Sequence, residues 1–477
     1  MNIKIFFICY IITTFFNDLG IPYMPSKSVP CCIIFIYLSL FCLLMYRQKV
    51  FVNDTIHIIK NKYNSLWIYV LFFVYILCLT IVQSLLGKTN PLPSIFGVIL
   101  QYGISLFCCY IVSAYTSYKM FSEKYLIRLI YSVFYIILLL GLVDFFVYIF
   151  NIVPLQKCMA LFFNVKQIMS NEAFVKAYSI GLPRVQSVYF EPGFFAEYTF
   201  FLLPIFYSLS LSKYKIFKNK YINSIIKKTT IPLIWIDLIL TQSPIWLVLS
   251  GISTAIFFGI KFIINFRRNI KKYTVILLTS MTVCCLTIVP ISTMNLKETY
   301  LGRIFTVVET MSNINLLIYS EQSLGTRISN VINLIDIGSR KTWFGYGHSN
   351  LVPQMEKQIL SGKSPVAITD EMRRMMLKKI PSLQNPPLTN IFVRYGIIAL
   401  FLYYAFILKS IFALKKCLKY VQGNMYNFIF GLQGTLISYI VISCYDILIA
   451  NLLCATFIGL SIGIIQRIAK QYERIIK

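Results

Sequence analysis

The sequence predicts an all-α protein that crosses a membrane about twelve times. Of its 477 residues, 58% are hydrophobic and only 13% are charged, whereas a typical soluble domain carries about a quarter charged residues. The hydrophobic residues form runs whose lengths are close to the roughly 20 residues that a membrane-spanning helix needs. The 45 Lys and Arg outnumber the 17 Asp and Glu, which gives a formal charge of +28, and they lie in short clusters between those runs.

This composition argues against several other classes of protein. A nucleic-acid-binding protein gathers its basic residues on one folded face, whereas here the apolar runs keep them apart, so no nucleic-acid partner is expected. Most of the 13 Cys lie inside apolar runs, and the sequence has only two His, His57 and His348. A zinc or iron–sulfur site needs several ligands at short spacing, so none is expected.

The expected spans follow the apolar runs in chain order. The run 3–16 is short, but no small-residue cleavage site of a signal peptide follows it. The run 229–265 is too long for one helix, and Thr241–Pro244 divides it into a helical hairpin because proline interrupts a helix. The twelve expected spans are 3–16, 29–46, 64–86, 93–116, 129–151, 192–212, 229–241, 244–265, 273–292, 389–409, 426–446 and 449–466.

The basic clusters predict the orientation of these spans. With this count, most Lys and Arg of the connecting segments fall on one side, and the positive-inside rule makes that side cytoplasmic, together with both termini. The chain then divides into 1–292, with nine spans and an external loop near 152–191, a large external loop at 293–388, and 389–477, with three spans and a cytoplasmic tail. No internal repeat is visible, which argues against a transporter built from two similar halves.

The first candidate group on the expected external face contains Arg184, Glu191 and Pro192. Proline suits the first position of a helix, and a helix N-terminus that faces outward favours an anion. Arg184 could add a bidentate contact to phosphate, and Glu191 could orient an arginine or accept a proton. The alternative is that both charged residues only stabilise the end of a helix.

The second group contains Gly325, Thr326 and Arg327 in the large loop. An amphipathic helix is expected over 327–337, with Thr326 as N-cap and Gly338 as stop. Arg327 would then stand at a helix N-terminus, where a cation is electrostatically unfavourable and a bound anion would compensate; the alternative is a solvated surface arginine. The expected apolar face consists of Ile328, Val331, Ile332 and Ile335.

The third group is Gly345, Tyr346, Gly347 and His348, which follows two aromatic residues. The glycine pair indicates a tight turn against a flat ligand such as a sugar. His348 is the one histidine expected outside and could act as a general base near neutral pH. The alternative is a histidine that takes no part in the chemistry.

The fourth group lies at the start of the tenth span. Asn390 and Arg394 are four residues apart and share a helix face, Thr389 could cap that helix, and Pro386 and Pro387 precede it. The alternative for Arg394 is that it extends outward to the headgroups. Paired carboxylates for Mg²⁺ are missing from these groups, and arginines can replace a divalent cation on a diphosphate. If the protein is a transferase, one that uses a lipid-diphosphate sugar without a metal therefore fits best, and no metal and no cofactor are expected.

These patterns resemble the bacterial O-antigen polymerase and O-antigen ligase families. The resemblance lies in the expected span count, the largest external loop between spans nine and ten, and four short motifs. It is clearest over 180–405. The motifs are Arg184 with Ser187, Glu191 and Pro192; Gly325-Thr326-Arg327; Gly345-Tyr346-Gly347; and Thr389-Asn390 with 395–400.

The resemblance implies a glycosyltransferase in the bacterial cytoplasmic membrane that joins oligosaccharide repeat units of O-antigen, capsule or exopolysaccharide at the outer face. Its donor and acceptor would be linked to undecaprenyl diphosphate. Arg184, Arg327 and Arg394 would hold the diphosphate, and His348 or Glu191 would accept the hydroxyl proton. The other implied partners are the lipid bilayer, which would admit the lipid tails between helices, and a regulator of chain length.

Two other functions remain open on the sequence alone. An O-antigen ligase would use the same donor but transfer the finished glycan to lipid A core. Ligase-type sequences often carry His-Asn at the start of span ten, whereas Thr389 precedes Asn390 here, which favours the polymerase. A flippase or exporter of lipid-linked glycan would place charged residues along a central path, whereas the candidate arginines gather at the external face.

Overall fold

The computed structural model is described for part of the chain only, and every structural statement below concerns those residues. The described residues are 3–15, 41, 46, 49–61, 64–86, 91–156, 184–185, 187–189, 192–210, 212, 215–259, 307, 309–310, 312–320, 322–370, 372–373, 386–444 and 452–476.

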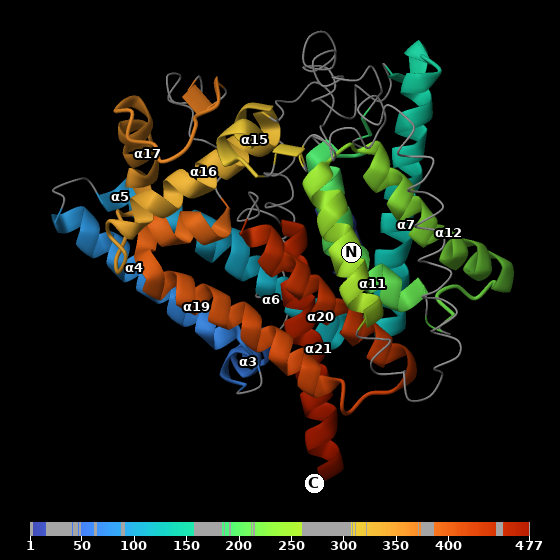
Figure 1. Cartoon of the computed structure of the whole chain (residues 1–477). Coiled ribbons are helices and arrows are strands. Elements are labelled where there is room, and N and C mark those ends of the chain that lie inside the picture. The colour runs from blue at the N-terminus through green and yellow to red at the C-terminus, as the bar shows by residue number, and fades with distance from the viewer. Residues whose placement is uncertain are drawn as a thin grey trace.

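The described chain is helical and contains no strand (Figure 1), which agrees with the expected all-α class. The helices are α1 (Ile3–Phe15), α3 (Lys49–Lys60), α4 (Leu66–Leu86), α5 (Pro91–Val98), η1 (Ile99–Phe107), α6 (Cys108–Tyr115), η2 (Thr116–Met120), α7 (Glu123–Ile149), α11 (Pro192–Ser210), α12 (Lys220–Leu240), α15 (Ile314–Ser320), α16 (Gln322–Ser339), η4 (His348–Asn350), α17 (Leu351–Leu360), α19 (Pro387–Cys417), α20 (Gly423–Ser443) and α21 (Leu452–Ile476).

Six of the described helices are long and apolar enough to cross a membrane, and this supports a membrane protein. They are Leu66–Leu86, Leu92–Met120, Glu123–Val147, Pro387–Cys417, Met425–Ser443 and Leu452–Gln471. Two further apolar helices, Lys4–Phe15 and Pro244–Gly259, are shorter. The expected spans 192–212 and 229–241 correspond to α11 and α12, which are not among these six helices. Most of 29–46 and all of 273–292 lie outside the described residues, so the count of twelve stays a prediction.

The expected break in the run 229–265 is confirmed. Helix α12 ends at Leu240, a turn follows, and the next helix starts at Pro244. Gln242 within this turn has a positive φ of 50°, a conformation that continues no right-handed helix.

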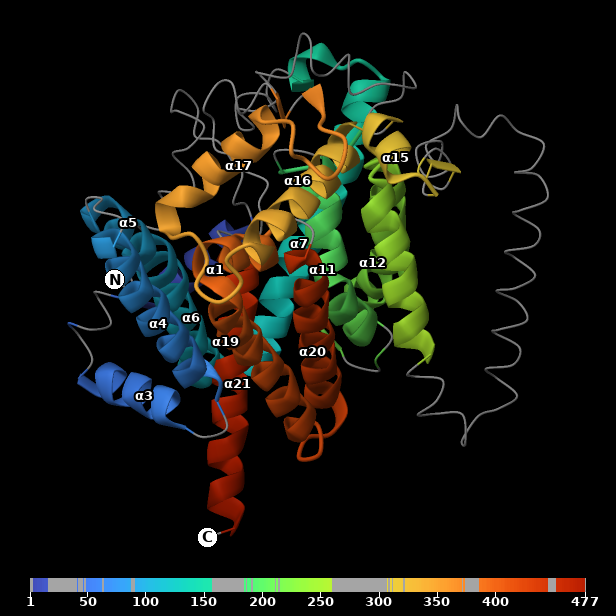
Figure 2. The ribbon, with the colours of Figure 1, turned by 60° about the vertical axis from the view of Figure 1, so that its left-hand side comes forward.

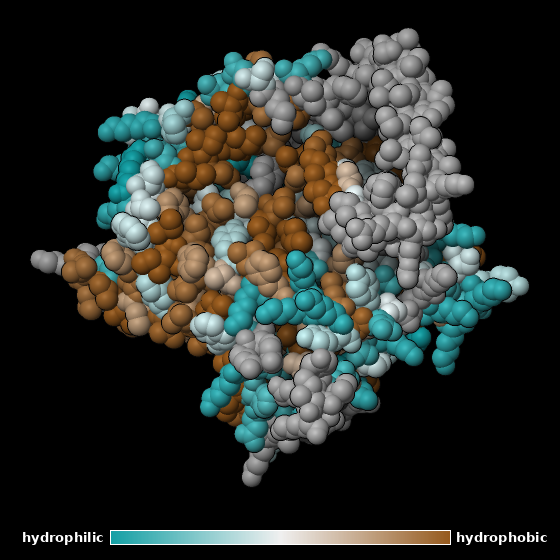
Figure 3. Space-filling view, turned by 60° about the horizontal axis from the view of Figure 1, so that its bottom comes forward, coloured by the Kyte–Doolittle hydropathy of each residue, from teal (hydrophilic) through white to brown (hydrophobic). Residues whose placement is uncertain are grey.

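Helix α11 lies inside the bundle and packs against α12 and α20. All its residues except Phe194 and Ser210 are buried. A helix enclosed by protein does not have to be apolar toward lipid, which explains how α11 accommodates Glu197 and Pro204. By contrast, α4 and α7 expose large hydrophobic side chains such as Leu71 and Ile136, as expected of helices that face lipid. Figure 3 shows hydrophobic residues covering a broad part of the surface, with hydrophilic residues in separate patches.

Small residues let α21 approach α6 closely. Gly459 and Gly463 form a GxxxG pattern on α21, which in membrane helices permits close backbone contact. A Cβ added at Gly459 would lie 2.5 Å from Cβ of Ser113 and 2.7 Å from the Tyr110 carbonyl oxygen. One hydroxyl cluster spans the same contact, because Tyr10 Oη lies 2.8 Å from Ser113 Oγ and 2.9 Å from Thr456 Oγ1. This cluster joins α1, α6 and α21.

The bundle has two distinct ends. Helices α15, α16 and α17 lie at one end, and the C-terminal part of α21 extends from the other (Figures 1 and 2). Three of the candidate groups fall on α16, on the loop after it and on the start of α19, and therefore at the first end.

Candidate functional site beneath helix α16

Helix α16 buries polar side chains together with the apolar Leu334 and Ile337, and it exposes part of its apolar stripe. Arg327 is only 5% exposed, and Asn330 and Asn333 are fully buried. The expected apolar face is only half buried, and Ile335 is 45% exposed. A polar face directed inward at one end of a membrane bundle is a place for a polar ligand, while the apolar face can lie at a lipid interface.

The expected start of this helix was wrong. Helix α16 begins at Gln322, so Thr326 is an internal residue and not an N-cap. Its hydroxyl lies 2.8 Å from the Thr369 hydroxyl. Arg327 consequently stands beyond the first turn, and the argument from a cation at this helix N-terminus does not apply. The end is close to expectation, since the helix stops at Ser339, one residue after Gly338.

Arg327 lies instead at the N-terminus of α11. A Cβ added at Gly193 would be 3.5 Å and 3.7 Å from the two terminal nitrogens of Arg327. Helix α11 begins at Pro192, as expected from proline at the first helical position. The guanidinium therefore reinforces the positive end of the α11 dipole. Glu191, the residue before Pro192, lies outside the described residues.

Arg184 is held against the hairpin turn that follows α12. Its Nε donates to the Thr241 carbonyl at 3.0 Å, and a terminal nitrogen donates to Ser243 Oγ at 3.5 Å. The backbone N–H of Ser187 donates to Asp144 of α7 at 3.1 Å, and the Ser187 hydroxyl donates to the Ile137 carbonyl at 2.8 Å. The buried carboxylate of Asp144 thus fixes the segment that carries Arg184, a role that the sequence alone did not reveal.

The glycine turn of the third group docks on a break in α19. Gly396 has φ 78° and ψ −174° inside this helix, a conformation that is essentially restricted to glycine. The carbonyls of Val393 and Arg394 then accept bonds from Tyr346 N–H at 2.8 Å and Gly347 N–H at 2.9 Å. The glycine turn is visible in the sequence but its partner is not, because the break at Gly396 lies in a continuous apolar run.

The same turn is held from a second side by α4. The Gln83 amide donates to the Phe344 carbonyl at 2.6 Å. Because the N–H of Gly347 is already used within the protein, Gly347 has a clear structural role, and contact of Gly345 and Gly347 with a glycan stays a prediction.

His348 is enclosed between α5 and α19. Its Nδ1 lies 2.6 Å from the Tyr395 hydroxyl, and a Cβ added at Gly97 would lie 2.5 Å from its Nε2. Burial and the neighbouring Arg394 guanidinium lower the pKa of His348 to about 4. The imidazole is therefore neutral at neutral pH and is a weak base.

Asn390 and Arg394 lie on the first part of α19, before its break. Arg394 interacts electrostatically with His348 and Tyr395. Asn390 is 8% exposed, and its Oδ1 has no hydrogen-bond partner among the described residues. Thr389 had been expected to cap this helix, but it does not. Helix α19 starts at Pro387, whose fixed φ suits the first helical position.

The structure thus brings the candidate residues into two groups. Arg327 lies at the start of α11, while Gly345, Gly347, His348 and Arg394 surround the break in α19. Helix α16 joins the two groups, because Phe392 of α19 packs against Gly338. Arg184 is in neither group and lies against the turn after α12. Within the described residues, no three His, Cys, Asp or Glu side chains gather as a metal site.

Comparison with known proteins gives no family assignment, because no family model and no curated protein matches the sequence.

Proposed function

We propose that the chain is a membrane-embedded glycosyltransferase that polymerises repeat units carried on undecaprenyl diphosphate at the outer face of the bacterial cytoplasmic membrane. The observation that carries this proposal is the contact of the buried Arg327 with Gly193 in the first turn of α11. A guanidinium and a helix N-terminus both favour an anion. The resemblance to O-antigen polymerases names that anion as a diphosphate.

In the proposed reaction, a hydroxyl of the acceptor sugar attacks the anomeric carbon of the donor glycan. A new carbon–oxygen bond forms while the bond to the lipid diphosphate breaks, and the diphosphate leaves with the electron pair. Arg327 stabilises the charge that develops on this leaving group. Arg184 and Arg394 contribute from the turn after α12 and from the break in α19.

The hydroxyl proton passes to a base, and Glu191 is the better candidate of the two. It directly precedes Pro192 in the sequence. His348 has a pKa of about 4 and shares Nδ1 with the Tyr395 hydroxyl, which favours a positioning role. The buried Oδ1 of Asn390 is available to accept a hydrogen bond from a sugar hydroxyl.

The test uses a strain that lacks the gene and is complemented with variants. Arg184→Ala, Arg327→Ala and Arg394→Ala should each reduce long-chain polysaccharide on the order of 100-fold, because one preorganised contact to the developing charge is worth about 3 kcal/mol. Arg327→Lys should restore little, since lysine lacks the bidentate geometry. Arg340→Ala is the matched control, because Arg340 lies just after the end of α16, has a 49% exposed side chain and pairs with Asp336.

The glycan profile of the deletion strain separates the alternatives. Glycans of one repeat unit support the polymerase. Polymer that accumulates on its lipid carrier would indicate a ligase, and short lipid-linked units trapped in the cytoplasm would indicate a flippase. Normal chain lengths in all three arginine variants, at normal protein levels, would exclude the proposed role of the arginines.

A further inference from the structure

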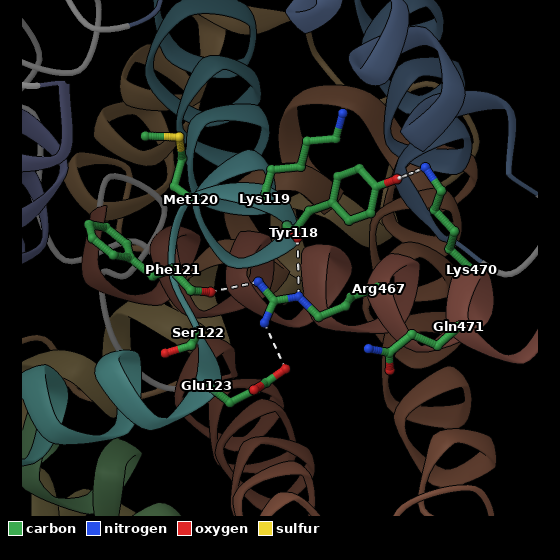
Figure 4. Close-up of a pocket in the computed structure, with 9 residues that line it drawn as sticks. All are labelled: Tyr118, Lys119, Met120, Phe121, Ser122, Glu123, Arg467, Lys470 and Gln471. Carbon is green, nitrogen blue, oxygen red and sulfur yellow. Dashed lines mark hydrogen bonds and ion pairs between the residues drawn. The ribbon is translucent and has the colours of Figure 1, made fainter.

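A second candidate site lies at the opposite end of the bundle, where the C-terminal half of α21 meets the turn between η2 and α7. A cavity of about 480 Å³ opens there, which is within the size range of small-molecule sites. We call it the basal pocket (Figure 4). Its lining consists of Tyr118, Lys119, Met120, Phe121, Ser122, Glu123, Arg467, Lys470 and Gln471.

Arg467 gives the basal pocket a fixed shape. Its Nε donates to the Tyr118 carbonyl at 3.1 Å, and one terminal nitrogen donates to the Phe121 carbonyl at 2.6 Å. The other terminal nitrogen lies 2.7 Å from Glu123 Oε1, and the Arg467 side chain is only 15% exposed. These bonds fasten the turn to α21 (Figure 4), so the pocket is formed before any ligand arrives.

The lining has an excess of positive charge. It contains three cations, Lys119, Arg467 and Lys470, and one carboxylate, Glu123, which Arg467 neutralises. Lys470 donates to the Tyr118 hydroxyl at 3.2 Å, and Lys119 pairs with Asp54 at 2.5 Å. An ammonium group has three N–H donors, so both lysines retain donors for an anion. Ser122 and Gln471 add neutral donors.

The level of the basal pocket points to the source of that anion. The apolar helix Leu92–Met120 ends at the pocket, Glu123–Val147 begins there, and Leu452–Gln471 ends there. The end of an apolar span marks the boundary between hydrocarbon and headgroups. Basic pockets between membrane helices at this level bind anionic headgroups.

We propose that the basal pocket binds the phosphate group of a ligand, and that an anionic phospholipid headgroup supplies it. Lys119 and Lys470 contact the phosphate oxygens, while Arg467 holds the turn in place. The site is separate from the candidate site beneath α16, and it does not depend on the function proposed above.

The test measures lipid binding to the full-length protein in a neutral detergent by native mass spectrometry. Phosphatidylglycerol and phosphatidylcholine are added in parallel. The wild type should retain phosphatidylglycerol in preference, and Lys119→Gln combined with Lys470→Gln should weaken that binding about 10-fold or more. Lys470→Gln alone leaves the Lys119–Asp54 ion pair intact. This single variant replaces the double variant in the test if the double variant folds poorly.

The matched control removes the same charge elsewhere. Lys415 and Lys416 are exposed in the last turn of α19, so Lys415→Gln with Lys416→Gln should leave the lipid preference unchanged. A second arm adds glycerol 3-phosphate and follows thermal unfolding. Stabilisation that only the pocket variants lose would assign the phosphate to a soluble ligand. Equal phosphatidylglycerol retention by pocket and control variants, with no such stabilisation, would overturn the proposal.

Discussion

Replacing Gly396 by alanine should cost about 3–5 kcal/mol of stability. A non-glycine residue at φ 78° and ψ −174° carries about 1–3 kcal/mol of backbone strain. The added Cβ would also overlap the Trp343 carbonyl and lie 2.6 Å from the Phe344 amide nitrogen. Relief of this overlap separates the glycine turn from α19 and weakens bonds worth about 1 kcal/mol each, such as the 2.8 Å bond from Ile397 N–H to the Thr342 carbonyl.

The assay is thermal and SDS-induced unfolding of the purified protein in detergent, followed by tryptophan fluorescence. Gly251→Ala is the control, because Gly251 lies within the helix Pro244–Gly259 and an added Cβ meets nothing within 4 Å. That change should be neutral or stabilising by up to about 1 kcal/mol, as helix propensity predicts. If Gly396→Ala were as stable as the wild type, the break in α19 and its docking with the glycine turn would be incorrect.

Two further predictions concern His348 and the contact between α21 and α6. The pKa of His348 is about 4 in the folded protein against 6.5 ordinarily, so the unfolded chain binds the proton more readily. Above pH 6.5, His348 should thus contribute up to about 3 kcal/mol to the free energy of unfolding, and this contribution is lost as pH falls toward 4. The free energy of unfolding of His348→Gln should therefore depend less steeply on pH over this range. An unchanged slope would contradict the lowered pKa of His348. Gly463→Leu should prevent α21 from packing on α6, because any Cβ there overlaps the Ala114 carbonyl, whereas Gly251→Leu should fold normally. Size-exclusion chromatography and trypsin resistance would check this, and equal behaviour of the two variants would count against the close contact.

The sequence alone determined the helical class, the membrane character and several helix boundaries. These features depend on local chemistry. Proline at the first helical position indicated the start of α11, and Thr241–Pro244 divided the run 229–265. Apolar runs near the length of a span identified the helices that could cross a membrane. Such signals are readable because each one acts over a few neighbouring residues.

Tertiary structure decided which side of each helix faces inward and which distant residues meet. The sequence shows an apolar stripe on α16, but only the structure shows that Asn330 and Asn333 are buried with Leu334 and Ile337 while Ile335 is 45% exposed. A membrane interface can accommodate such an exposed apolar side chain. The contact of Arg327 with Gly193 and the docking of Gly347 on Arg394 join segments far apart in the chain. Sequence periodicity carries no information about such contacts, since they depend on how whole helices pack.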